Sequence, residues 1–215
     1  MDIEEIWPLY ALRLTAGDLE LRVVRPSDVP ELVDLVLSGV HDPALMPFTV
    51  PWTDAPDDEL PAAYYRYVAS VIGCLAPGDW KLEMAGRERG TLVGVQALSA
   101  RDFPVTRTAE TGSWLARRHQ GRGVGTRMRQ MACAFAFDHL GAEQITSGAF
   151  LDNPASLGVS RKVGYRPNGV ARCSIRGAMA LSQRLVLDPA DLVRGESVTV
   201  EGADAVRRFL GIDAA

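Results

Sequence analysis

Apolar positions repeat with two different periods along the 215 residues of the chain. Alternation at every second position predicts strands, whereas repeats at three- and four-residue spacing predict amphipathic helices. The strands are expected over 10–15, 19–24, 80–84, 91–97, 108–116, 143–150, 166–176 and 178–187. The helices are expected over 28–38, 60–75, 122–140, 154–163 and 202–210. Because the two kinds of element alternate, the pattern predicts an α/β fold of one domain, 1–215, with a mixed sheet and helices on both faces.

Local signals mark where several of these elements begin and end. Asp28 and Glu31 have the spacing of a capping box at the start of the first helix. Asn153 is a favourable N-cap and Pro154 a favourable first helical residue. Gly141 follows the helix that precedes it and is expected at its C′ position. The polar stretch 86–90 predicts a turn between two strands.

The segment between 39 and 58 is a proline-rich loop, with prolines at 43, 47, 51 and 56. It is long for a connection in a compact domain, which favours a functional role. Its end is acidic, with Asp54 followed by Asp57, Asp58 and Glu59. These acids are interpreted either as favourable charge at the N-terminus of the next helix or as an acidic lip that meets a cationic amine.

The most informative stretch runs from Trp114 to Thr126, at the end of a predicted strand and the start of a predicted helix. Gly121, Gly123 and Gly125 occupy alternate positions, where the absence of Cβ atoms lets a ligand approach the main chain. The residues that follow place apolar side chains on one helical face, at Val124, Met128, Met131 and Phe135. Free amides at a helix N-terminus favour an anion. Between Arg117 and Arg129 there are five arginines, one histidine and no acid, so a phosphate-bearing ligand is expected.

Three interpretations of this turn compete on the residues alone. A P-loop requires G-x-x-x-x-G-K-[ST], and no glycine of the turn is followed by lysine. A dinucleotide fingerprint requires G-x-G-x-x-G, but Thr126 stands at the last position, although Glu143 lies at a suitable distance to bind a ribose. The third interpretation is a glycine turn that serves geometry alone, with the arginines as a solvated face.

The wider segment carries two short motifs. Gln120 to Gly125 reads Q-G-R-G-V-G. Farther along, Asn153 to Ser156 reads N-P-A-S, and Lys162 to Tyr165 reads K-V-G-Y. The first motif is similar to the signature Q/R-x-x-G-x-G/A of the GNAT N-acetyltransferase superfamily, and the later residues resemble the second element of that family. The resemblance covers about 107–165 and is closest to the ribosomal-protein N-terminal acetyltransferase branch. It implies a mostly antiparallel sheet and a cofactor-binding core over about 107–165.

The resemblance also implies a reaction, in which an acetyl group passes directly from acetyl-CoA to an amine in a ternary complex. The amine is a protein N-terminus or a small molecule. The resemblance assigns the pyrophosphate to the turn, the pantetheine arm to the strand end before it, and further contacts to the second element. The implied cofactor-binding residues are Leu115, Ala116, Arg117, Gln120, Gly121, Arg122, Gly123, Val124, Gly125, Thr126, Asn153 and Ser156.

Two residues are candidates for proton transfer. Glu110 lies in the strand before the turn and, by alternation, shares a face with Gly112 and Trp114, so it is expected to act as general base. An alternative interpretation pairs Glu110 with an arginine such as Arg107. Ser160 stands where many relatives carry a tyrosine that protonates the departing thiolate, and it is a candidate acid. Tyr165 is expected to pack in the core.

Composition narrows the remaining possibilities. The formal net charge of −4 gives nucleic-acid binding little support. No apolar run is long enough to span a membrane, and the acidic start lacks the basic region of a secretory signal, so a cytoplasmic location is expected. Three scattered cysteines, expected to be buried, and three scattered histidines predict no metal site. A monomer or homodimer is expected. The rival function is a non-catalytic acyl-CoA-binding sensor or interaction module on the same scaffold.

Overall fold

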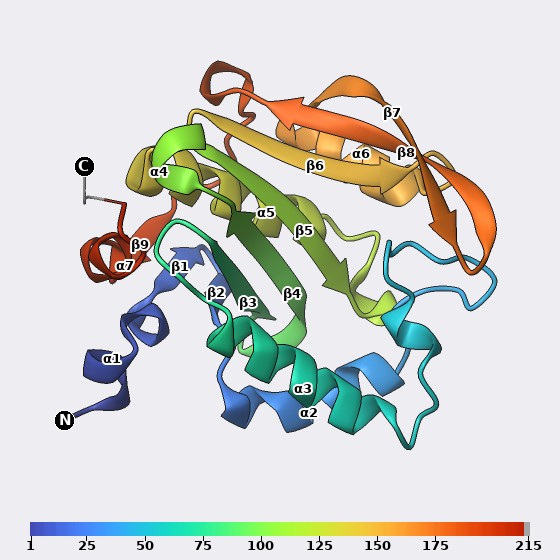
Figure 1. Cartoon of the computed structure of the whole chain (residues 1–215), viewed down its shortest axis with the longest axis horizontal. Coiled ribbons are helices and arrows are strands. Elements are labelled where there is room, and N and C mark those ends of the chain that lie inside the picture. Colours follow the sequence, from blue (N-terminus) through green and yellow to red (C-terminus); the bar gives the residue numbers. More distant parts are fainter. Residues whose placement is uncertain (213–215) are drawn as a thin grey trace.

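A computed structural model describes residues 1–212 and gathers its strands into one sheet (Figure 1). Within these residues the sheet has nine strands in the order β7-β8-β6-β5-β4-β3-β2-β1-β9. All neighbouring strands are antiparallel except β5 and β6, which run parallel. The predicted mixed, mostly antiparallel sheet is confirmed. The strands are β1 Arg13–Ala16, β2 Leu19–Val23, β3 Trp80–Glu88, β4 Thr91–Ala100, β5 Thr108–Leu115, β6 Gln144–Phe150, β7 Arg166–Ile175, β8 Ala178–Leu187 and β9 Thr199–Glu201.

Helices cover both faces of the sheet, as predicted. Figure 1 shows α2 and α3 in front of the central strands and α5 and α6 behind the sheet. The described helices are α1 Ile3–Ile6, α2 Val29–Leu37, α3 Leu60–Gly73, α4 Phe103–Thr106, α5 Val124–Phe135, α6 Pro154–Val163 and α7 Ala203–Phe209. A π-helical turn, Ala136–Leu140, extends α5 to Gly141, whose φ of 74° ends the helix in the left-handed region.

Two apolar cores separate these layers. The larger lies on the α5 face and includes Met84, Met128 and Phe135. The smaller lies under α2 and α3 and includes Leu32 and Tyr64. Strand alternation divides β5 between the two cores, with odd-numbered residues toward α5 and even-numbered residues toward α2 and α3. Side chains at successive positions of β5 therefore lie on opposite faces of the sheet.

Several boundaries differ from the sequence prediction for local physical reasons. Asp28 does not cap α2, because its carboxylate accepts hydrogen bonds from Arg22 Nη2 at 2.7 Å and the Arg25 amide at 2.8 Å. The strand β3 continues through most of the predicted turn to Glu88. The chain reverses at Arg89 and Gly90 alone, with φ of 51° and 79°. Positive φ at both central residues matches the tight hairpin turn whose twist suits antiparallel strands.

Other differences concern short elements and the cysteines. Residues Pro8–Ala11 form a 3₁₀ turn, so the first strand begins only at Arg13. The strand β9, which pairs with β1, is too short to show an alternating pattern. Among the cysteines Cys133 is buried as expected, but Cys74 is exposed and Cys173 half-buried. The helices predicted over 28–38, 60–75, 122–140, 154–163 and 202–210 are all present within a few residues.

Candidate active site

The central feature of the site is a split between β5 and β6. The two strands pair only from Thr108 to Glu110, opposite Gln144 to Thr146, whereas β5 continues to Leu115. The Ala116 amide donates to Val93 O, on the β4 side, at 3.1 Å. Because amide directions alternate along an extended chain, the amides of Ser113 and Leu115 point away from β4 and into the split. The split therefore offers an unpaired strand edge.

The glycine turn lies directly after this edge, and its glycines serve two purposes. Gly121 and Gly123 have φ of 74° and 85°, and a Cβ atom on either would meet nothing within 4 Å. Their conformation requires glycine, and their surroundings leave the main chain open to a ligand. Gly125 differs, because a Cβ atom there would lie 3.3 Å from Leu115 Cδ1. The third glycine allows α5 to pack closely on β5.

The amides of the turn are free over a shorter range than the sequence predicts. Among residues 1–212, the amides from Gly121 to Gly125 have no protein acceptor. The Gln120 amide donates to Arg117 O at 3.1 Å, and the Thr126 amide donates to Gly123 O at 3.0 Å. Both of these predicted donors are thus occupied. The open amides are those at the very N-terminus of α5, where a helix attracts an anion.

The predicted contacts of the strand end also shift. The amides of Ala116 and Arg117 donate to Val93 O and Gly39 O. The Gln120 side chain donates to Leu115 O at 2.8 Å and Val40 O at 2.7 Å, which fixes the turn against the loop after α2. Internal hydrogen bonds therefore occupy these groups. The free amides of the strand edge lie slightly earlier, at Ser113 and Leu115, although the Leu115 carbonyl is occupied by Gln120.

Acids from distant segments reduce the positive charge that the sequence suggests around the turn. Arg122 Nη2 lies 3.1 Å from Glu88 Oε2. Arg127 pairs with Asp18 at 2.7 Å and with Glu88 at 3.4 Å. His119 lies beside Arg122, and burial together with the neighbouring guanidinium groups lowers the pKa of its imidazole. Arginines near the turn thus belong to a mixed-charge network. This network cannot be predicted from the local sequence, because the stretch around the turn contains no acid.

The start of α6 confirms the predicted cap. Asn153 Oδ1 accepts a hydrogen bond from the Ser156 amide at 3.0 Å, with Pro154 at the first helical position. This cap uses one oxygen of Asn153 and the amide of Ser156. The contact of these two residues with a cofactor stays a prediction.

Glu110 lies at the point where β5 and β6 separate. It is the last residue of β5 that pairs with β6, and its neighbours across the sheet are Ser99 and Thr146. Its side chain is exposed on the face covered by α2 and α3. No ion pair involves Glu110 within residues 1–212, and Arg107 lies over the Phe103 ring instead, 5.8 Å from its centroid. The carboxylate is accessible at the apex of the split.

Ser160 lies on the opposite face and is 1% exposed. Its Oγ accepts a hydrogen bond from Arg129 Nη1 at 2.8 Å and donates to Ser156 O at 3.0 Å. The single hydroxyl proton is therefore committed, which weighs against the predicted role as acid. Tyr165 packs in the core as expected, with its hydroxyl 2.6 Å from Thr111 Oγ.

Sequence reasoning missed Arg129, which connects Ser160 to Ser113 Oγ, 3.0 Å from Arg129 Nη2. Arg129 belongs to the same arginine-rich stretch as Arg122 and Arg127, but it is 4% exposed. Its position in the helical repeat next to buried Met128 is the one signal that separates it from the others. That signal is weak, because long charged side chains commonly flank an apolar stripe.

The loop before α3 forms the other side of the site. Its Trp52 packs against Phe48, Tyr64 and Trp114, with ring centroids 5.2–5.9 Å apart. Arg176, in the turn between β7 and β8, binds the Asp54 carboxylate through Nε at 2.7 Å and Pro43 O through Nη1 at 3.1 Å. We call the Asp54–Arg176 ion pair the clasp.

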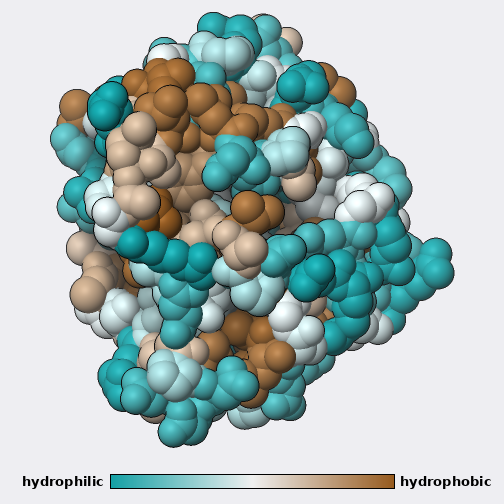
Figure 2. Space-filling model, turned by 90° about the vertical axis from the view of Figure 1, so that its right-hand side faces the viewer, coloured by the Kyte–Doolittle hydropathy of each residue, from teal (hydrophilic) through white to brown (hydrophobic). Residues whose placement is uncertain are grey.

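The clasp joins two segments that lie side by side at the right of Figure 1. Figure 2 looks onto this end of the molecule, where apolar side chains gather in the upper part and polar side chains cover the right-hand side. A hydrogen bond from Arg176 lowers the pKa of the Asp54 carboxyl. Of the predicted acidic lip, Asp54 is therefore occupied by the clasp, whereas Asp57 and Asp58 are exposed just before α3.

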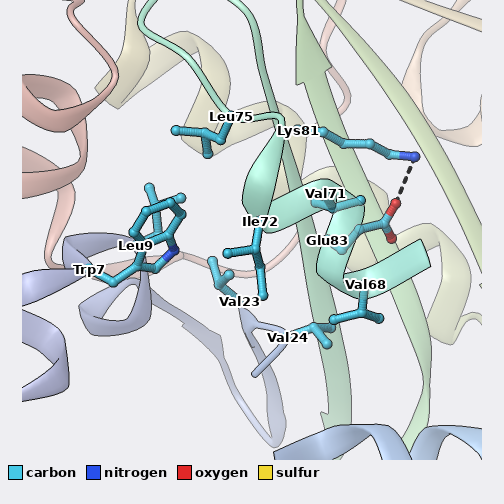
Figure 3. Close-up of a pocket in the computed structure, with 10 residues that line it drawn as sticks. All are labelled: Trp7, Leu9, Val23, Val24, Val68, Val71, Ile72, Leu75, Lys81 and Glu83. Carbon is cyan, nitrogen blue, oxygen red and sulfur yellow. Dashed lines mark ion pairs between the residues drawn. The ribbon is translucent and has the colours of Figure 1, made fainter. Parts of the chain in front are cut away.

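A separate apolar cavity lies between the N-terminal segment and α3 (Figure 3). Trp7, Leu9 and Ile72 are among its lining residues, and the Lys81–Glu83 ion pair lies at one end. Its volume of about 20 Å³ accommodates about one water molecule, so it is not a substrate site. Among residues 1–212 no group of His, Cys, Asp and Glu side chains could hold a metal ion. Over the same residues, no helix is both long and apolar enough to cross a membrane.

Comparison with known proteins agrees with this geometry. The model of the GNAT acetyltransferase domain matches residues 18–166, which is more than two thirds of the chain. The chain therefore belongs to the GNAT acetyltransferase family.

Proteins similar to this chain include members of the branch that the motifs resemble. One is the Bacillus subtilis protein named "Putative ribosomal N-acetyltransferase YdaF", 25% identical over 162 residues that span 72% of this chain and 81% of that protein. Mycobacterium smegmatis RimJ, solved with CoA-disulfide, has a TM-score of 0.71 at 20% identity and covers 91% of this chain and 90% of its own. RimL, a ribosomal L7/L12 α-N-protein acetyltransferase solved with coenzyme A, has a TM-score of 0.66 at 20% identity, covering 82% of this chain and 97% of its own. The likeness to the ribosomal-protein acetyltransferase branch is confirmed, and the chain is an acetyltransferase.

Proposed function

We propose that this acetyltransferase moves an acetyl group from acetyl-CoA directly to a primary amine, a protein N-terminus or a small-molecule amine. The observation that carries the proposal is the run of open amides from Gly121 to Gly125, next to an unpaired strand edge. A pyrophosphate suits the amides at the N-terminus of α5. An amide-containing arm such as pantetheine suits the edge at Ser113 and Leu115, which it would extend like a strand.

The residues around this edge supply the remaining cofactor contacts in the proposal. Arg122 carries a half-exposed guanidinium beside the open amides. The proposal also includes the predicted cofactor contacts of Asn153 and Ser156, which lie at the start of α6. Acetyl-CoA supplies the acetyl group as a thioester. An amide in the split, from Ser113 or Leu115, would polarise the thioester carbonyl.

Glu110 is the proposed general base. A primary amine is mostly protonated at neutral pH, because its pKa is about 8 for an α-amine and about 10 for a lysine-type amine. A protonated amine has no lone pair for attack on a carbonyl. The exposed carboxylate at the apex of the split can remove that proton directly or through a water molecule. General-base help of this kind typically contributes about 10²- to 10⁴-fold.

The acceptor approaches from the α2–α3 face in this proposal, since that is the face on which Glu110 is exposed. The aromatic wall of Trp52 and Trp114 borders the same face. Names of similar proteins support a protein amine as acceptor, because RimL is a ribosomal L7/L12 α-N-protein acetyltransferase.

The release of free thiol from acetyl-CoA in the presence of an amine panel tests the function. The panel contains short peptides with free α-amines, the same peptides with acetylated α-amines, and small diamines. We expect thiol release that requires a free amine and yields an acetylated product by mass spectrometry. Tight CoA binding with no release for any amine would instead identify the non-catalytic acyl-CoA-binding module.

A further inference from the structure

Arg129 is a buried cation without an anionic partner. Its guanidinium donates to Ser160 Oγ at 2.8 Å and to Ser113 Oγ at 3.0 Å, and both acceptors are neutral. The side chain is 4% exposed. Among residues 1–212 no carboxylate lies within 4.0 Å of it, and its Nε–H has no hydrogen-bond partner. Arg127, two residues earlier on the same helix, is by contrast half-buried and paired with acids.

Folding alone gives no reason for this arrangement. An unpaired charge in a protein interior carries a desolvation cost that neutral hydroxyl groups offset only in part. Substitution of buried charged groups by apolar side chains of similar volume is often tolerated without loss of folding stability. A guanidinium at this position therefore points to an anion that reaches it from outside the chain.

The position of Arg129 limits what that anion can be. Ser113 belongs to the stretch of β5 that borders the split, and Ser160 belongs to α6, which packs beside α5 on the same face of the sheet. The guanidinium thus lies behind the split, on the face of the sheet that carries α5 and α6. Glu110 lies at the apex of the same split on the opposite face. A group held in the split would have the carboxylate on one side and the guanidinium on the other.

We propose that Arg129 stabilises the thiolate that leaves in the acetyl transfer, an inference that rests on the proposed function. In that reaction the amine nitrogen forms a bond to the carbonyl carbon and the carbon–sulfur bond breaks. The electron pair of that bond departs on sulfur. The ammonium group gives up two protons in all: the first passes through Glu110 to water before the attack, and the second, left on nitrogen after the attack, passes to Glu110. The negative charge thus develops on the sulfur, and Arg129 is the buried cation that faces the split from the side opposite the base.

The groups around Arg129 keep their protons through the neutral range. Burial raises the pKa of the Cys133 thiol to about 11 and the pKa of the Tyr165 hydroxyl well above its ordinary value. Arg161 and Lys162 on α6 are exposed, and Glu110 lies on the other face of β5. A thiol bound in the split is therefore the group whose titration Arg129 would dominate.

The test compares the binding of CoA with that of desulfo-CoA, which lacks the sulfur, from about pH 6 to about pH 10 across the ordinary titration range of thiols. Calorimetry gives both dissociation constants. For the unmodified protein we expect the preference for CoA to grow with pH, by about tenfold for each unit by which the bound thiol's pKa is lowered. An opposite charge nearby typically lowers a pKa by about 1 to 3 units. Since both ligands carry the same phosphates, titrations near the glycine turn cancel in the ratio.

Variants of Arg129 test whether its positive charge causes the pH dependence of the CoA to desulfo-CoA binding ratio. Arg129→Met should remove the pH dependence of the ratio, and Arg129→Lys should retain part of it. Should Arg129→Met not fold, Arg129→Gln replaces it, because it removes the charge and keeps a hydrogen-bond donor.

Three outcomes would overturn the inference: a ratio independent of pH in the unmodified protein, an unchanged pH dependence in the uncharged variant, or a lysine variant as flat as the methionine one. Failure of both ligands to bind would count against the proposed function itself.

Discussion

The two faces of β5 differ in how they supply polar groups to the split. On the α5 face the open groups are main-chain amides, from Gly121 to Gly125, positioned by one turn and the helix that follows it. On the α2–α3 face the polar contacts are made by side chains from distant segments. The clasp, for example, joins residues 122 positions apart in the sequence. A site made from the main chain depends on local conformation, whereas a site made from distant side chains depends on how the segments dock.

This difference has a functional consequence. Cofactor contacts through the main chain are insensitive to most side-chain changes, provided that the glycines remain. The loop and the clasp can change in sequence without altering the fold of the sheet, since loops tolerate substitution. We infer that the α5 face binds the cofactor and tolerates sequence change at most of its side chains. The α2–α3 face is the part of the site that selects the amine acceptor.

The largest expected effect comes from Glu110→Gln, which keeps the shape of the side chain and removes its basicity. We expect kcat to fall by roughly ten- to a thousand-fold and to recover in part at high pH, where the amine loses its proton unaided. The affinity for acetyl-CoA should remain near normal. Glu201→Gln, the same change on the edge strand β9, is the control. An unchanged kcat at neutral pH would exclude Glu110 as the base.

A smaller effect is expected from Gly123→Ala on the α5 face. The new Cβ atom would project into open space where the pyrophosphate is proposed to bind, at a φ of 85° that disfavours it. We expect the dissociation constant of CoA to rise by about tenfold or more, which corresponds to about 1.4 kcal/mol. Calorimetry measures it.

Gly169→Ala separates ligand contact from backbone strain. Gly169 has a φ of 88° and equally open surroundings, but it lies in β7. Equal weakening of CoA binding by both substitutions would show that strain, and not contact with the ligand, causes the loss.

The clasp offers a test of the other face. Arg176→Gln should change KM for the amine acceptor by a few fold, because it removes the clasp between the loop before α3 and the β7–β8 turn. The affinity for CoA should remain unchanged, because the ion pair is exposed and contributes little to the stability of the fold. Arg166→Gln, at the other end of β7, removes a comparable pair with Asp188 and Asp191 and serves as the control. A change in CoA affinity without a change in KM for the amine would contradict the division of the two faces.

The pH dependence of the clasp follows from the same ion pair. Its arginine lowers the pKa of the Asp54 carboxyl in the folded state. The contribution of the clasp is therefore complete above the ordinary carboxyl pKa of about 4 and is lost as the pH falls through the lower folded value. Between about pH 5 and about pH 9, the effect of Arg176→Gln on KM should be constant.

The smallest effect concerns stability. If Arg129 serves the leaving group and not the fold, Arg129→Met should leave the free energy of unfolding unchanged or raise it. Denaturant unfolding measures the difference. A loss of more than about 3 kcal/mol, as expected when a buried network is broken, would show that the guanidinium holds β5 and α6 together.

The parts of the site that depend on local conformation could be predicted from the sequence. The glycine turn, the start of α5, the Asn153 cap and the face of β5 that carries Glu110 all depend on residues close together in the chain. Conformational preferences, capping and alternation act over a few residues, so a local pattern is sufficient to predict them. The same signals predict where free amides occur. They do not predict that the amides of Gln120 and Thr126 donate hydrogen bonds to main-chain carbonyls of the turn.

Tertiary structure alone decided which charges meet. Arg127 and Arg129 are two residues apart in one helix, yet Arg127 pairs with Asp18 and Glu88 while Arg129 is buried between two serines. The clasp likewise needs the β7–β8 turn to lie against the loop before α3. The local sequence distinguishes these arginines only by the weak signal of the helical repeat beside Met128, because the partner of a long charged side chain depends on which distant segment docks beside it. The sequence by itself determined the main-chain half of the site, and the packing of helices and loops around the sheet determined the side-chain half.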